Sequence, residues 1–312
     1  MRHTEIPRFT PSIFTEQYLQ GFSVPGAVNG SNHHHIFGCY PIEDILPYFR
    51  LPVEPNRRTF YFMVMLTEGF GRWSWGLNKY DISAPTLCFM PSGQVSTIEM
   101  IDASTRGWYC MFDDHFFLDH GHSFALERLP YFAHTAYPML HLKEEQASML
   151  NAAFREIYTF GVGNGAESPF PATAETLAAS LLRTLLLRAE ILYGSEASPV
   201  PSVSAEALIT KRFKDVLLQN IRTATTVSEY AALLHVTPSH LNRCVKRTSG
   251  QAASELIAEM AVLEAKVLLH QSEMSIADIA DALRFEDSAY FSRFFKKNTG
   301  FTPTEYRQQN TR

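Results

Sequence analysis

The chain has 312 residues, of which 46% are hydrophobic and 19% charged, and its formal net charge is −5. This length predicts about two domains, and the composition excludes a disordered or fibrous protein. The four cysteines form no CxxC pair, which disfavours a disulfide framework and a zinc finger. With no apolar run long enough to span a membrane and no visible signal peptide, we expect a cytoplasmic protein without membrane contact.

Short strands are predicted in the first half of the chain. Residues 59–112 contain β-branched and aromatic segments separated by Gly, Pro and Asp, a pattern typical of a sandwich or barrel. Helical periodicity follows at about 143–160 and 173–193. We therefore expect a first domain over residues 1–194.

A linker and a helical domain are predicted next. Residues 195–204 read SEASPVPSVS, with two prolines and four serines. From residue 205 to 312 the pattern is helical throughout. This region carries 14 Lys and Arg against 12 Asp and Glu, whereas residues 1–203 carry 13 against 20. Such an asymmetry predicts different partners for the two parts of the chain.

The last domain contains an internal repeat. Ala231 and Ala280 are 49 residues apart, whereas Arg243 and Arg293 are 50 apart. A shift of one residue between two segments that keep their register is typical of a duplicated helix-turn-helix, here at about 227–248 and 276–298. Thr237 and Asp287 are expected to cap the second helix of each unit, and a glycine follows each of those helices.

Each second helix is predicted to bury one apolar face and to present cations on the other. In the second unit Phe291 and Phe295 face inward, which turns Ala289, Arg293 and Lys296 outward. Arginine can bind guanine, asparagine can bind adenine, and lysine suits phosphates. The predicted DNA contacts from this pattern are Ser239, His240, Asn242, Arg243 and Lys246 in the first unit, and Ala289, Arg293, Lys296 and Lys297 in the second. A plain solvated helix face is the alternative, which the recurrence in two units disfavours.

Residues 209–307 resemble the DNA-binding domain of AraC/XylS-family transcription regulators. The resemblance is carried by SIADIA at 275–280 and by FEDSAYFSRFFKKNTGFTPTEYR at 285–307. It implies two helix-turn-helix units, joined by a helix at about 255–271, that enter successive major grooves of double-stranded promoter DNA. It places base reading on Ser239, Asn242 and Arg243, and on Ser288, Ala289, Tyr290 and Arg293. It further implies a ligand-responsive activator, a small-molecule effector, contact with RNA polymerase, and a homodimer paired through the two N-terminal-domain helices.

Two positions depart from the family pattern. Arg284 stands where the family usually has glycine, which predicts either a strained turn or a phosphate contact. Ala261 lies near a position that is usually arginine, so one buried tie on the joining helix is expected to be missing.

The first domain is similar to cupin-like sensor domains, so the predicted fold class is α+β, with a cupin-like β-barrel and a helical pair followed by an all-α domain. Metal-binding cupins carry an HxH pair and a later PxGxxH. The corresponding positions hold Trp73-Ser74-Trp75 and end in Ser96. We therefore predict no metal, no cofactor and no catalytic residue, and we interpret His33–His35 and the group His115, His120 and His122 as loop or capping residues.

Five aromatic residues are candidates for an effector pocket: Tyr61, Trp73, Trp75, Phe89 and Trp108. They can stack on a planar or sugar-like ligand, or they can simply fill a β core. Two other interpretations of the whole chain stay open. One is a cupin-type metal enzyme with a helical appendage, and the other is a ligand-independent regulator whose barrel is a scaffold.

Overall fold

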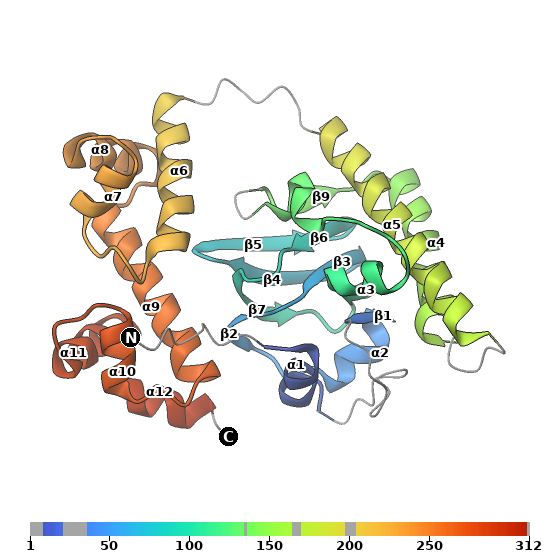
Figure 1. The fold of residues 1–312 in the computed structure, drawn as a ribbon, viewed down its shortest axis with the longest axis horizontal. Coiled ribbons are helices and arrows are strands. Elements are labelled where there is room, and N and C mark those ends of the chain that lie inside the picture. The colour runs from blue at the N-terminus through green and yellow to red at the C-terminus, as the bar shows by residue number, and fades with distance from the viewer. Residues whose placement is uncertain (1–8, 21–35, 134–135, 164–169, 197–203, 311–312) are drawn as a thin grey trace.

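The computed structural model describes residues 9–20, 36–133, 136–163, 170–196 and 204–310. Two sheets and their helices form an N-terminal region, and a set of helices forms a C-terminal region beside it (Figure 1). Most of the predicted linker, at 197–203, lies outside the described residues, as do His33–His35.

The N-terminal strands form two antiparallel sheets. The five-stranded sheet has the order β1-β8-β3-β6-β9, and the four-stranded sheet has the order β2-β7-β4-β5. The strands are β1 (Phe37–Pro41), β2 (Val53–Arg57), β3 (Tyr61–Glu68), β4 (Phe70–Trp75), β5 (Asn78–Ser83), β6 (Thr86–Met90), β7 (Val95–Ile101), β8 (Arg106–Phe112) and β9 (Met139–His141). The expected closed barrel is therefore wrong: within the described ranges the strands pair in two separate sheets. The α+β class is confirmed.

The five-stranded sheet is buried on both faces. Met63 and Met65 of β3 pack in the core that it shares with two helices, whereas their neighbours Val64 and Leu66 pack against the other sheet. Successive residues of a strand point to opposite faces, so a sheet covered on both sides needs apolar residues at every position. This requirement explains the uninterrupted hydrophobic run at 60–66.

The two helices predicted near 143–160 and 173–193 are present as α4 (Glu144–Tyr158) and α5 (Pro171–Glu196), with a π-helical turn at Thr159–Gly163. They cover the outer face of the five-stranded sheet (Figure 1). The other helical segments of this region are short: α1 (Pro11–Tyr18), α2 (Ile42–Ile45), η1 (Leu46–Tyr48), α3 (Asp114–Asp119), η2 (Leu126–Arg128) and η3 (Pro130–Phe132).

The C-terminal region contains two similarly arranged helical units. Its helices are α6 (Ala205–Asn220), α7 (Val227–Leu233), α8 (Pro238–Ser249), α9 (Ala253–Gln271), α10 (Ile276–Ala282), α11 (Ser288–Thr299) and α12 (Pro303–Asn310). Helices α7 and α10 begin 49 residues apart, and α8 and α11 begin 50 residues apart. The extra residue lies in the second turn. Gly250 and Gly300 follow α8 and α11 with φ of 79° and 84°, a left-handed conformation that glycine adopts without a Cβ clash.

The two units have separate hydrophobic cores on one shared helix. The first core combines α6, α7 and α8 with the start of α9, and Met260 is its last fully buried member. The second core begins at Ala265 of α9 and includes α10, α11 and α12. Glu264, which is fully buried, lies between them. Helix α9 is thus the structural spine of the C-terminal region.

This spine is docked on strand β2. The Arg57 guanidinium binds the Glu264 carboxylate through two hydrogen bonds, Nη1 to Oε1 at 3.2 Å and Nη2 to Oε2 at 2.9 Å. Gln271 bonds both the N–H and the C=O of Arg57 at 2.9 and 3.0 Å. Further along, the Tyr306 hydroxyl lies 2.6 Å from a Glu54 carboxylate oxygen. The two regions therefore meet through directional polar contacts as well as apolar packing.

Candidate nucleic-acid interface

Helix α8 is the second helix of the first unit. The Thr237 hydroxyl accepts from the His240 N–H at 3.2 Å and so caps its start, as predicted. Leu241, Cys244 and Val245 are buried, and Leu241 and Val245 belong to the first core. The face opposite them is exposed and carries these predicted DNA contacts: Ser239, Asn242, Arg243 and Lys246, with His240 half-buried at its edge.

Helix α11 repeats this arrangement. The Asp287 carboxylate accepts from the Tyr290 N–H at 2.6 Å, and Phe291 and Phe295 are fully buried. Phe294 is half-buried and packs on Phe285 with 4.9 Å between ring centroids. The outward face carries Ser288, Ala289, Tyr290, Arg293, Lys296 and Lys297, all of them exposed. The aromatic face holds the helix in place, and this leaves the cationic face in solvent.

Both helices lie on the side of the C-terminal region that is turned away from the sheets (Figure 1). The contacts with β2 use α9 and α12 instead. The N-terminal region therefore does not cover the two cationic faces. A pair of exposed, cationic second helices of two helix-turn-helix units is the arrangement that suits successive major grooves of a duplex.

The structure gives Asn242 a role that sequence reasoning missed. Its side-chain oxygen accepts from the Ala253 N–H at 2.9 Å. One of the free N–H groups at the start of α9 is satisfied in this way. Asn242 thus joins the predicted reading helix to the spine, and base reading by Asn242 stays a prediction.

Two arginines of α8 have partners within the protein. Arg243 Nη2 lies 2.8 Å from Nδ1 of His240, one turn earlier. Arg247 Nη1 lies 3.1 Å from Oε1 of Glu206 in α6. On α11, Arg293 lies over the Tyr290 ring, 6.0 Å from its centroid. These contacts orient long side chains before any ligand is bound.

A cavity of about 420 Å³ lies where the N-terminal region meets α6. Its N-terminal wall is rich in aromatic residues, and its α6 wall mixes polar and aliphatic side chains. The lining includes Trp75, Tyr80, Tyr131, Tyr137, Lys211 and Asp215. Partial burial raises the pKa of the Asp215 carboxyl above its usual value, and the nearby Lys211 opposes this effect. Lys214 donates to Asn78 at 3.1 Å and so links the two walls.

Only part of the predicted effector set lines this cavity. Trp75 and Phe89 do. Tyr61, Trp73 and Trp108 do not line it, and effector binding by any of the five stays a prediction. Trp73 is buried between the sheets, and Trp108 donates its indole N–H to Asn151 at 2.6 Å in the helix-side core. Tyr61 packs in the same core, with its ring 4.8 Å from that of Phe132.

The positions that correspond to cupin metal ligands hold other residues with other surroundings. Ser96 accepts a hydrogen bond from the buried Arg58 at 2.9 Å, and Trp73 and Trp75 are both buried. Asp113 caps α3 by accepting from the Phe116 N–H at 3.0 Å. His120 and His122 lie near Glu175 and Ser180 of α5. In the part of the chain that the structure describes, no group of three His, Cys, Asp or Glu residues is arranged to hold a metal ion.

The C-terminal geometry agrees with comparisons to known proteins. A family described as a helix-turn-helix domain matches residues 230–309. Residues 230–309 form a helix-turn-helix domain. This domain includes both cationic helices and the spine between them.

Curated relatives support the same assignment. The chain is 32% identical over 155 residues to the arabinose operon regulatory protein of Escherichia coli, which covers 49% of each chain. It is 28% identical over 129 residues to YijO, an uncharacterised helix-turn-helix-type transcriptional regulator of the same species, covering 41% of this chain and 44% of the relative. The chain thus spans about half the length of these relatives or less.

A solved structure of ToxT from Vibrio cholerae aligns over 89% of this chain and 98% of its own, at 15% identity. The TM-score of 0.37 is too low for that likeness to support an inference. None of the described helices is long and apolar enough to cross a membrane.

Proposed function

We propose that this protein is a sequence-specific DNA-binding transcription regulator that uses both units of its AraC/XylS-type domain. The observation that supports this most strongly is the pair of second helices, which expose equivalent cations: Arg243 with Arg293, and Lys246 with Lys296. Arginines near the middle of each helix reach base edges, and the lysines one turn later neutralise phosphates. Ser239, Ala289 and Tyr290 lie at the helix starts, where a groove floor comes closest.

Selection from random duplexes tests this proposal directly. The full chain is expected to enrich two conserved half-sites about one helical turn apart and to bind them with a steep dependence on salt. Lys297→Ala should weaken binding to selected and random DNA alike and should reduce the salt slope by about 1. Recovery of no preferred sequence by the well-folded chain would remove the proposal.

We propose further that the regulator responds to a small molecule in the cavity beside α6. Trp75, Tyr80 and Tyr137 offer rings for stacking, and Lys211 and Asp215 offer polar partners, so a planar or sugar-like effector fits. Because α6 packs in the core of the first helix-turn-helix unit, occupancy of this cavity is coupled to that unit. The expected outcome is activation of a promoter through contact with RNA polymerase.

A thermal-shift screen of monosaccharides and planar heterocycles tests the cavity. A hit should raise the melting temperature of the wild type, whereas Tyr137→Ala, at a half-exposed position, should remove the shift. A shift that survives in Tyr137→Ala and Lys211→Ala would place the ligand elsewhere.

We also propose that the chain forms a homodimer through α4 and α5. The exposed fractions of Leu187 and Ile191 in α5 are 39% and 72%, and that of Met149 in α4 is 40%. Exposed apolar residues on two adjacent helices suit a subunit contact. Ile191→Glu should shift the mass in solution to that of a monomer, and an unchanged mass would count against this face.

A further inference from the structure

The relative orientation of the two helix-turn-helix units is not fixed by a common core. Each unit packs around its own apolar cluster, and α9 is the element that both clusters share. A single helix resists bending, but it is the one element that belongs to the cores of both units, so it constrains their relative orientation only weakly. A lateral contact between the units would therefore have a large effect on the angle at which their two cationic helices meet DNA.

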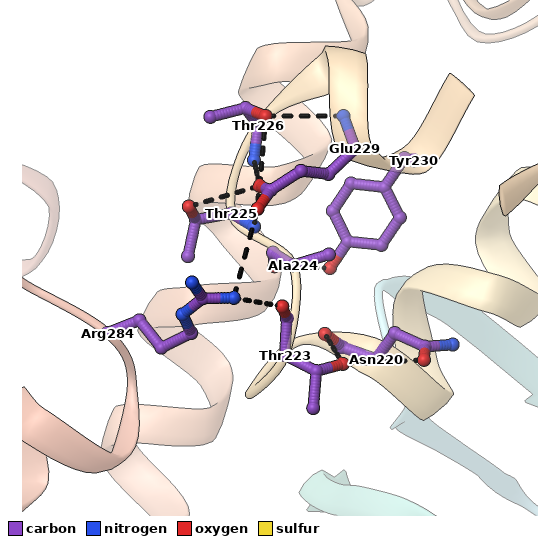
Figure 2. A network of polar contacts seen from close by, with 8 residues as sticks. All are labelled: Asn220, Thr223, Ala224, Thr225, Thr226, Glu229, Tyr230 and Arg284. Carbon is purple, nitrogen blue, oxygen red and sulfur yellow. Dashed lines mark hydrogen bonds and ion pairs between the residues drawn. The ribbon is translucent and has the colours of Figure 1, made fainter. Parts of the chain in front are cut away.

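Arg284 makes such a contact. It lies in the turn between α10 and α11, and its Nη1 donates to the backbone carbonyl of Thr223 in the first unit. The same nitrogen lies 3.8 Å from Oε1 of Glu229, at the start of α7. Figure 2 shows the guanidinium reaching across from the second unit to the α6–α7 turn. The contact joins residues 61 positions apart in the chain.

The acceptor side is held in place before Arg284 arrives. The Thr223 N–H bonds the Asn220 carbonyl at 2.9 Å, and the buried Tyr230 hydroxyl donates to the Ala224 carbonyl at 2.9 Å. Glu229 in turn accepts from the Thr226 N–H at 2.9 Å and the Thr225 N–H at 2.8 Å. These bonds, visible in Figure 2, fix the direction of the Thr223 carbonyl. A rigid acceptor turns one hydrogen bond into a constraint on orientation.

The donor side shows the cost of placing arginine here. Arg284 has φ of +60°, a left-handed conformation that is unfavourable for any residue with a Cβ. His235 occupies the equivalent turn of the first unit with φ of +56°. Glycine would relieve the strain at either position. At 284, however, glycine would also remove the guanidinium that crosses to the other unit.

We propose that Arg284 is a positioning residue that locks the two units at one relative orientation and so sets the half-site spacing that the protein accepts. The inference rests on the proposed DNA-binding function. It assigns Arg284 to a contact within the protein, in place of the phosphate contact that the sequence also allowed.

The test measures the affinity of the full chain for duplexes with the selected half-sites at their selected spacing and with one base pair inserted or removed. One base pair rotates a half-site by about 34° relative to the other. The wild type should discriminate strongly between these duplexes. Arg284→Ala and Arg284→Gly should each reduce that discrimination by roughly tenfold, the lower end of the usual scale for losing one charge-assisted hydrogen bond. Arg284→Lys, which keeps a donor, should retain part of it.

His235→Gly is the matched control, because it relieves the same strain without touching Arg284. It should leave the spacing preference unchanged. A uniform loss on all spacings in Arg284→Ala would indicate a phosphate contact and overturn the inference. An unchanged preference in both Arg284→Ala and Arg284→Gly would overturn it as well. If the wild type itself binds no duplex preferentially, the proposed function fails instead.

A measurement without DNA separates these cases. Spin labels at the exposed positions 233 in α7 and 308 in α12 report the distance between the units. The distance distribution should broaden in Arg284→Gly and stay narrow in His235→Gly. Because this readout needs no ligand, it tests the lock even if the proposed function is wrong. An equally narrow distribution in Arg284→Gly would show that the orientation is fixed without Arg284 and would overturn the inference.

Discussion

The two helix-turn-helix units share a scaffold but differ in how their cationic helices are held. In the first unit α8 is tied to its surroundings through its own polar face, because Asn242 binds the start of α9 and Arg247 binds Glu206 of α6. In the second unit Lys296 and Lys297 of α11 have no ion pair within 4 Å among the described residues. That unit contacts the N-terminal region through α12, where the Tyr306 hydroxyl binds Glu54 of β2. Equivalent positions on α8 and α11 therefore need not contribute equally to the proposed DNA binding.

The largest predicted effect concerns the ion pair between Arg57 of β2 and Glu264 of α9. Glu264→Ala should destabilise the protein by about 3–5 kcal/mol, because it leaves the Arg57 guanidinium buried without its partner. Urea denaturation followed by circular dichroism measures this. The double variant Arg57→Met with Glu264→Met should come close to the wild type, since an apolar pair fills the same space. A loss below about 1 kcal/mol in Glu264→Ala would show that water reaches the pair.

A second prediction separates the two reading helices. Arg293→Ala should cost about 1–3 kcal/mol on the selected duplex and much less on random DNA, as expected for a base contact. Arg243→Ala should cost less, because the Arg243 guanidinium must first leave His240. Fluorescence anisotropy with both duplexes measures the two losses. Equal losses for the two variants would remove the asymmetry, and equal losses on both duplexes would argue against base reading.

A third prediction uses equivalent positions on the two helices. Asn242→Ala should destabilise the fold by about 1 kcal/mol, because the N–H of Ala253 loses its acceptor. Ser292 is the equivalent residue of α11, and its hydroxyl bonds only the Ser288 carbonyl one turn earlier. Ser292→Ala should therefore stay within about 0.5 kcal/mol of the wild type. Thermal unfolding of the two variants compares them, and an equal effect would contradict the structural role of Asn242.

The smallest predicted effect is a dependence on pH. Hydrogen bonds from the Thr225 and Thr226 backbone lower the pKa of Glu229 from 4.5 to about 2. Because the pKa is lower in the folded state, the carboxylate stabilises the fold above pH 4.5, and this contribution is lost as the pH falls toward 2. Glu229→Gln should flatten that part of the stability profile.

Asp278 gives the matching control in the second unit. Ser275 lowers the pKa of this capping carboxyl in the same way. Asp278→Asn should flatten the stability profile over the same acidic pH range. It should not affect the contact between Arg284 and the first unit. A stability profile for Glu229→Gln that parallels the wild type at every pH would refute the assignment.

The sequence predicts the C-terminal region well because its signals are local. Helix caps at Thr237 and Asp287, and an apolar face at Phe291 and Phe295, are each set within a few residues. The repeat then indicates which faces are equivalent. Predicting the N-terminal region needed long-range information. Whether two sheets close into a barrel depends on strand pairs far apart in the chain, and composition does not determine them.

For a related reason, the sequence does not show which of the predicted effector residues border the cavity beside α6. Aromatic residues occur on most strands of the two sheets, both in the cores and at the cavity, so their pattern does not show which of them border a cavity. Trp75 and Trp73 lie two positions apart on β4, yet only Trp75 lines the cavity beside α6. The ion pair of Arg57 with Glu264 likewise has no local signal, because its partners are 207 residues apart.

Strand β2 and helix α9 form a joint that a truncated protein would lack. A fragment that begins at α6 would carry Glu264 into water without its counter-ion and would free the flank of α9 that Gln271 now secures. The angle between the two reading helices would then depend on α9 and Arg284 alone. If the proposed function holds, binding sites selected by such a fragment should therefore vary more in half-site spacing than those selected by the full chain.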